Sequence, residues 1–160
     1  MSIENVRNYF AQFGRDGDIL EFETSSATVA LAAQAVGTIP ARIAKTLSFQ
    51  GSDDTAILIV CAGDVKIDNS KFKAFFHTKA KMLTPEQVSQ LTGHTVGGVC
   101  PFANPPGVKT YLDISLRRFQ SIFPAAGSSN SAIELTCPEL EEYSGSLEWI
   151  DICKGWQEES

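Results

Sequence analysis

A segment rich in glycine and proline, residues 97–107, restricts the fold of this 160-residue chain more than any other. It holds three glycines and three prolines in eleven positions. Glycine lacks the Cβ that blocks close backbone approach, and proline fixes φ and limits the residue before it. The segment therefore predicts a stiff loop rather than a helix or a central strand. Outward-facing amides of Gly98 and Val99 could hold an anion there, although turn chemistry alone also explains the composition.

The composition is that of a globular protein with a single domain, residues 1–160: 43% of the residues are hydrophobic and 20% are charged. The longest apolar run, Ala56 to Ala62, is too short to cross a bilayer, and the N-terminus does not resemble a signal peptide, so we expect a cytoplasmic protein. The net charge of −6 argues against a broad face for duplex DNA. It leaves room for a local cationic pocket that binds a single-stranded end.

The four cysteines, Cys61, Cys100, Cys137 and Cys153, form no CxxC pair and have no histidine at ligand spacing. We therefore expect neither a metal site nor a disulfide framework. Cys61 lies in an apolar run and is expected in the core. For Cys100 the pattern favours a small packed thiol over a nucleophile, which would need a base and a lowered pKa. No glycine-rich nucleotide-binding motif follows a strand, and we expect no cofactor.

Apolar periodicity and turn residues predict a mixed order of helices and strands. Helices are expected over residues 2–13, from caps at 24–26 to 36, from 68 or 69 to 76, over 85–92 and over 138–143. Strands are expected over residues 19–22, 41–49, 55–62, 65–67, 108–112, 119–124, 130–136 and 147–152. This order suits an α+β domain whose mixed sheet is curled or closes partly into a barrel, with helices around it. Residues 157–160 indicate a loose acidic tail.

Alternation along the strand at 41–49 places Lys45 on the same face as Ile43, Leu47 and Phe49. A lysine on an apolar face is costly unless it meets an anion or lines a cavity. On an edge strand it would instead extend its amine to water. The pattern alone leaves both interpretations open.

Five segments together resemble one family. They are the Ala-rich helix of 24–37, the Lys-Thr-Leu strand of 43–49, the Gly-Gly-Val-Cys-Pro-Phe loop of 97–102, the strand and Asp of 111–116, and the late glycine of 125–128. Their order and spacing are similar to those of the YbaK/ProX aminoacyl-tRNA deacylases, which include free-standing relatives of the prolyl-tRNA synthetase insertion domain. The resemblance covers the chain from about residue 5 to 143 and implies a YbaK-like fold.

The resemblance also implies trans-editing, the hydrolysis of the ester that joins a wrong amino acid to the 3′-terminal adenosine of a tRNA. The expected amino acid is small (alanine, serine, threonine or cysteine), with tRNA-Pro as a candidate tRNA and prolyl-tRNA synthetase as a candidate partner. The expected catalytic residues are Lys45, Gly97, Gly98 and Val99. The expected substrate-binding residues are Thr46, Cys100, Pro101, Asp113, Gly127, Ser128 and Ser129, with no metal.

The chemistry of ester hydrolysis supports these assignments independently. Loop amides at Gly98 and Val99 could stabilise an oxyanion, and Lys45 is a compact cation suited to a carbonyl, a ribose or a phosphate. His77 is expected to be a surface or packing residue, and no Ser-His-Asp set is evident. Two rivals remain: a non-catalytic module that binds an aminoacyl or nucleotide end, and a hydrolase or redox protein that uses Cys100.

Overall fold

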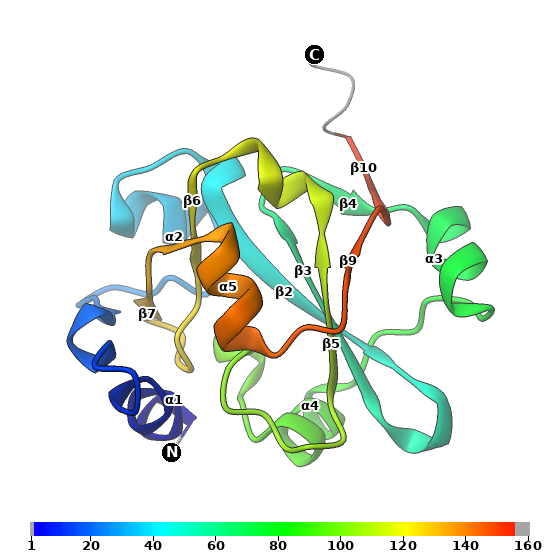
Figure 1. The fold of residues 1–160 in the computed structure, drawn as a ribbon, viewed down its shortest axis with the longest axis horizontal. Helices are drawn as coiled ribbons and strands as arrows, with labels where there is room; N and C mark the ends of the chain where they lie inside the picture. Colours follow the sequence, from blue (N-terminus) through cyan, green and yellow to red (C-terminus); the bar gives the residue numbers. More distant parts are fainter. Residues whose placement is uncertain (1, 156–160) are drawn as a thin grey trace.

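A mixed six-stranded sheet lies at the centre of the computed structural model, which describes residues 2–155 (Figure 1). Its strands lie in the order β8-β6-β2-β3-β5-β9. The strand bounds are β1 (Leu20–Glu21), β2 (Ile43–Gln50), β3 (Ala56–Ala62), β4 (Lys66–Ile67), β5 (Lys109–Asp113), β6 (Ser121–Pro124), β7 (Ser131–Ala132), β8 (Leu135–Thr136), β9 (Trp149–Ile150) and β10 (Cys153–Lys154). The pairs β1-β7 and β4-β10 are separate two-stranded ribbons in the described part of the chain.

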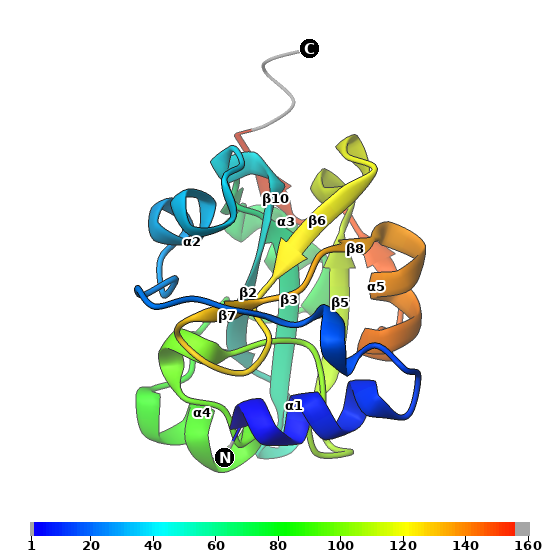
Figure 2. The ribbon, with the colours of Figure 1, turned by 90° about the vertical axis from the view of Figure 1, so that its left-hand side faces the viewer.

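Helices surround this sheet, and Figures 1 and 2 show α1 and α4 near one end of it, with α2 and α3 at opposite sides. Their bounds are α1 (Ser2–Ala11), α2 (Val29–Val36), α3 (Asn69–Phe76), α4 (Pro85–Thr92) and α5 (Cys137–Ser144). The expected α+β fold with a curled, mixed sheet is thus confirmed. Among residues 2–155, no helix is long and apolar enough to span a membrane.

The predicted hairpin of β2 and β3 forms the middle of the sheet. The two strands pair antiparallel from Ala44↔Ala62 to Gln50↔Ala56. β6 runs parallel beside β2, and β5 runs parallel beside β3. Every residue of β3 is buried, as expected for the strand with the longest apolar run, and Cys61 lies in the core as predicted.

Besides shifts of a few residues at the ends of several elements, the structure departs from the predictions in three places. Helix α2 begins at Val29 with Thr28 as its cap rather than at 24–26, because the amide of Ser26 donates to Ser129 O at 2.6 Å and holds that segment extended. The single extended stretch expected at 130–136 is two strands, which pair with β1 and β6 respectively. The strand β10 has no counterpart among the predictions, and the tail predicted at 157–160 lies outside the described residues.

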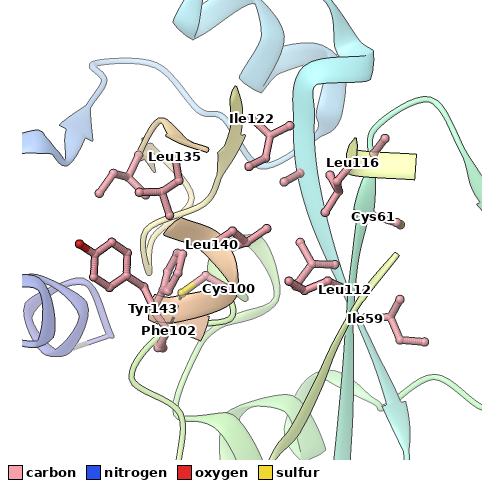
Figure 3. Close-up of a cluster of buried hydrophobic side chains, with 14 of the residues drawn as sticks. Ile59, Cys61, Cys100, Phe102, Leu112, Leu116, Ile122, Leu135, Leu140 and Tyr143 are labelled. Carbon is pink, nitrogen blue, oxygen red and sulfur yellow. Dashed lines mark hydrogen bonds between the residues drawn. The ribbon is translucent and has the colours of Figure 1, made fainter. Parts of the chain in front are cut away.

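The glycine- and proline-rich loop is anchored from inside the core. Cys100 and Phe102 are fully buried within the hydrophobic core (Figure 3). The Phe102 ring packs edge-on against Phe10 with centroids 4.9 Å apart. The buried His94 places its Nε2 atom 3.1 Å from Phe102 O and 3.6 Å from Cys100 Sγ. The Asn104 amide donates to Cys100 O at 3.0 Å. Buried polar contacts therefore fix both sides of the loop.

A second anchor is the close approach of Gly98 to the backbone at 127–128. A Cβ added to Gly98 would lie 2.8 Å from Ser128 Cα and 3.0 Å from Gly127 C. Real Cβ atoms essentially never come this close to backbone, so the contact requires glycine at 98. It places the loop directly against the segment that follows β6.

We therefore predict that Gly98→Ala lowers the free energy of unfolding by about 1–3 kcal/mol, since the methyl group forces two backbone segments apart. Gly107→Ala is the matched control within the same loop, because its added Cβ would meet nothing within 4 Å. Urea unfolding of both variants measures the difference. Equal stabilities would show that the contact at Gly98 is not tight.

The buried His94 leads to a second prediction, on how folding stability depends on pH. Burial lowers the pKa of His94 below its usual 6.5, so the unfolded chain takes up a proton that the folded chain resists. Folding stability should thus fall as the pH drops below about 6.5, by up to about 1.4 kcal/mol per pH unit. His94→Gln should flatten this dependence in denaturant titrations between pH 7.5 and 5.5. His77→Gln, at an exposed site, should retain the full dependence, and an unchanged slope in His94→Gln would contradict the prediction.

Candidate active site

A pocket of about 350 Å³ opens where the pairing of β2 with β6 ends. The parallel pairing with β6 involves only Ile43↔Phe123 and Ala44↔Pro124, and beyond Ala44 the two strands separate. The pocket is lined by residues 43–48 of β2, by residues 26–29 and Ala32 at the start of α2, by residues 82–88 in part, and by Gly97, Val99, Phe123, Ala125, Ser131 and Ala132. Most of this wall is apolar.

The edge of β2 presents backbone hydrogen-bonding groups to this pocket. Ser48 O accepts from Leu83 N, and Gln50 N donates to Lys81 O, so even-numbered residues of β2 direct their amides and carbonyls away from β3. Thr46 follows the same alternation. Because the pairing with β6 ends at Ala44, the amide and carbonyl of Thr46 face the pocket without a strand partner. Its side-chain Oγ1 is buried and has no hydrogen-bond partner.

Lys45 lies on the sheet face that alternation predicts, since it pairs with Cys61 as Leu47 pairs with Ile59. Its side chain is half-buried, lines the pocket and donates to Val65 O. The structure thus supports the cavity-lining interpretation of this lysine over an amine directed only to water. The Asp64 carboxylate lies close enough to Lys45 for the two charges to interact. Its pKa is lowered mainly by its ion pair with Arg118 and to a smaller extent by Lys45.

The predicted loop reaches the pocket through Gly97 and Val99. Gly98 differs from the expectation of a bare amide, because residues 96–98 form a 3₁₀ turn in which Gly98 N donates to Thr95 O at 2.9 Å. An oxyanion would therefore compete with this internal bond at Gly98. The amides of Gly97 and Val99 are the better candidates for binding a carbonyl oxygen.

The segment of Gly127, Ser128 and Ser129 packs against residues that line the pocket. Ser128 Oγ donates to Asn130 Oδ1 at 2.9 Å and lies 2.7 Å from Ser131 Oγ, and Ser131 is a lining residue. Ser129 O accepts from the amide of Ser26. A Cβ at Gly97 would lie 3.1 Å from Ser129 Cβ and 3.3 Å from Ala27 Cβ. The structure thus brings this segment, the loop and the start of α2 together.

Of the seven expected substrate-binding residues, Thr46 lines the pocket and the other six do not. Cys100 and Pro101 are buried on the core side of the loop, and burial raises the pKa of the Cys100 thiol to about 12. Asp113 is fully buried as well, where its carboxylate accepts from the amides of Ser115 and Ile152 at 2.9 Å. These contacts cap one 3₁₀ turn and hold the chain after β9. Cys100, Pro101 and Asp113 thus lie away from the pocket wall, and their part in substrate binding stays a prediction.

The sequence predictions missed the wall formed by Met82, Leu83, Pro85, Val88 and Phe123. Pro85 and Val88 belong to α4 and Phe123 to β6, whereas Met82 and Leu83 precede α4, and no local motif marks any of them. Among the described residues, no group of three or more His, Cys, Asp or Glu side chains is arranged to hold a metal.

Comparison with known proteins matches this architecture. The sequence model of the aminoacyl-tRNA editing domain covers residues 23–143. The chain is 56% identical over 157 residues to the Bacillus subtilis protein YwhH, covering 98% of this chain and all of YwhH, whose function is uncharacterised. It is 30% identical over 104 residues to EbsC of Enterococcus faecalis, named as a candidate Cys-tRNA(Pro)/Cys-tRNA(Cys) deacylase, covering 64% of this chain and 63% of EbsC.

Two solved structures share the whole fold. A candidate trans-editing enzyme for prolyl-tRNA synthetase superposes with a TM-score of 0.85 at 29% identity, covering 96% of this chain and 98% of that protein. The hypothetical protein APE2540 superposes with a TM-score of 0.81 at 26% identity, covering 94% and 99%. The open edge of β2, with its lysine and its glycine loop, therefore lies within a fold that these relatives share. The chain belongs to the aminoacyl-tRNA editing domain family.

Proposed function

We propose that this protein is a trans-editing hydrolase that cleaves the ester bond of a mischarged aminoacyl-tRNA. The observation that carries the proposal is the pocket at the open edge of β2, where Lys45, Thr46, Gly97 and Val99 line one cavity. Membership of the editing family supports aminoacyl-tRNA as the substrate class for this pocket. The activity would be exerted on aminoacylated tRNA and therefore in the cytoplasm.

The groups around the pocket suit ester hydrolysis by positioning. Lys45 is a cation beside the cavity that can hold the ester carbonyl, the ribose or the terminal phosphate. Amides of Gly97 and Val99 can stabilise the oxyanion that forms when water attacks the carbonyl carbon. The electron pair of the breaking bond then passes to the ribose oxygen, which takes up the proton that the attacking water gives up and leaves as a hydroxyl, while the amino acid leaves as its carboxylic acid. The neighbouring ribose hydroxyl helps to position the attacking water.

The size and lining of the pocket favour a small amino acid: alanine, serine, threonine or cysteine. A volume of about 350 Å³ is near the lower end of the range for ligand sites. The apolar wall would reject a larger side chain by overpacking, whereas it discriminates weakly among small ones. The name of EbsC supports cysteine among these candidates and tRNA-Pro as the carrier. The name of the solved trans-editing relative supports prolyl-tRNA synthetase as a partner.

Cysteine-dependent catalysis is disfavoured by the surroundings of Cys100. The thiol is fully buried, and a pKa raised to about 12 leaves almost no thiolate at neutral pH. His94, the histidine beside it, is also buried and has a lowered pKa. The pair therefore serves the packing of the loop better than nucleophilic attack.

The test of the proposed function is Lys45→Met, which keeps the length of the side chain and removes its charge. We predict that hydrolysis of a mischarged small-amino-acid tRNA falls at least 100-fold, since the loss of an electrostatic group in the site costs about 3 kcal/mol or more. Deacylation is followed by the release of labelled amino acid across a panel of mischarged tRNAs. Circular dichroism checks that the fold is retained.

Lys154→Met is the matched control, because Lys154 is an exposed lysine on β10 and does not line the pocket. It should hydrolyse the panel at the wild-type rate. Two results would overturn the proposal: full activity of Lys45→Met, or tight binding by the wild-type protein without hydrolysis of any member of the panel. The second result would favour the non-catalytic binding module.

A further inference from the structure

A second hollow of about 550 Å³ lies at the far end of β2, outside the candidate active site. We call it the basic groove and define it by Lys79, Lys81, Lys109, His77, Phe76 and Tyr111, which line it together with Gly51, Ser52 and Thr55 of the β2-β3 turn. Lys79, Lys81 and His77 follow helix α3, whereas Lys109 and Tyr111 belong to β5. The three lysines and His77 are exposed.

Positive charge is concentrated at this groove although the whole chain carries a net charge of −6. Residues 69–84 contain four lysines and one histidine and no acidic residue. Lys79, Lys81 and His77 of this segment line the groove, whereas Lys71 pairs with Asp151. Of the described residues that line the groove, none is Asp or Glu. The ion pairs found between described residues use none of its three lysines. These cations are therefore available to an anionic ligand.

Aromatic rings form one wall of the groove beside these cations. Tyr111 meets Phe75 and Phe76 edge-on, with ring centroids 5.7 and 5.2 Å apart. Phe76 and Tyr111 are half-buried and line the groove. Cationic side chains combined with aromatic faces are the features by which proteins hold single-stranded nucleic acid, the former on phosphates and the latter on bases. A simple inorganic anion would not require the aromatic wall.

The groove and the candidate active site share one stretch of chain. Lys81 lines the groove, and its backbone carbonyl accepts a hydrogen bond from the backbone amide of Gln50. The next residues, Met82 and Leu83, line the pocket. Along β2, Lys45 and Gln50 are five residues apart, or about 16 Å. Phosphates recur about every 3.4 Å along one strand when the bases are stacked and farther apart when they are not. A few nucleotides would therefore reach from the pocket to the groove.

We propose that the basic groove binds the sugar-phosphate backbone of the unpaired nucleotides that precede the esterified adenosine. This inference rests on the proposed function for the direction of the strand, because the adenosine must lie in the pocket when its neighbours lie in the groove. Lys79, Lys81 and Lys109 contact phosphates, and the rings of Tyr111 and Phe76 contact a base or a ribose. The groove then adds affinity for the polynucleotide without touching the reacting ester.

The experiment compares two substrates with the triple variant K79Q/K81Q/K109Q. One substrate is a mischarged tRNA, and the other is the same amino acid esterified to adenosine alone, which lacks the preceding phosphates. The variant should lose roughly 10- to 100-fold in kcat/KM on the tRNA, mainly through KM, and retain its rate on the aminoacyl-adenosine. Each lost phosphate contact should also lower the slope of log(kcat/KM) against log[salt] by about 0.7, or about 2 for all three.

Direct binding separates this inference from the proposed function. Fluorescence anisotropy with an uncharged single-stranded RNA of five nucleotides ending in CCA needs no hydrolysis, and the triple variant should bind it at least 10-fold more weakly than the wild type. Lys154→Gln, the control outside the groove, should bind as the wild type does. Lys45→Met should lose activity on both substrates, unlike the triple variant.

Three results would overturn the groove as a single-strand site. They are equal affinities of the triple variant and the wild type for the RNA, equal affinity of the wild type for a blunt RNA duplex, and equal losses on tRNA and aminoacyl-adenosine. If the wild type binds the RNA through the lysines but hydrolyses no ester, the result supports the groove as a binding site for single-stranded RNA and contradicts the proposed hydrolysis.

Discussion

The structure depends on an unequal pairing of β2. On one side this strand pairs with β3 over seven residues, which holds it firmly in the middle of the buried hairpin. On the other side it pairs with β6 at only two residues. Backbone amides and carbonyls that would normally be used inside a sheet are thereby left beside a cavity. A polar ligand can satisfy them, and this supports the edge of β2 as the proposed binding surface.

Three stretches distant in sequence close this cavity, and backbone contacts hold them together. The start of α2 is tied to Ser129 by the amide of Ser26, and the glycine loop rests on the backbone of Gly127 and Ser128. From the other side, His94, Cys100 and Phe102 anchor the loop in the core. The loop is therefore stiff for two reasons, namely its own proline and glycine content and the packing on both of its faces.

Much of the fold could be predicted from the sequence because its strongest signals are local. The capping box at Thr84 and Gln87, the closing glycines at 37 and 93, and the hairpin around residue 51 all appear in the structure as expected. The start of α2 could not be predicted, because Thr24, Ser25 and Ser26 are all good caps. The choice of Thr28 follows from the distant contact of Ser26 with Ser129.

The site was predictable to the extent that its residues carry unusual local features. Lys45 was identifiable as a charge on an apolar face, and Gly97 by its place in the loop. Cys100 and Asp113 belong to the same motifs but point into the core, which only the packing of the loop and of β5 determines. The apolar wall from Met82 to Val88 and the basic groove had no motif, because each arises where segments far apart in the chain meet.

The way the cavity is held together has a consequence for its evolution. Its frame consists of main-chain hydrogen bonds and glycine contacts, whereas its inner surface consists of apolar side chains such as Val29, Ala32, Val88 and Phe123. Exchanges among these side chains would reshape the interior and leave the frame in place. Under the proposed function, a family built on this plan can change its choice of amino acid through these side chains while it keeps the same main-chain frame.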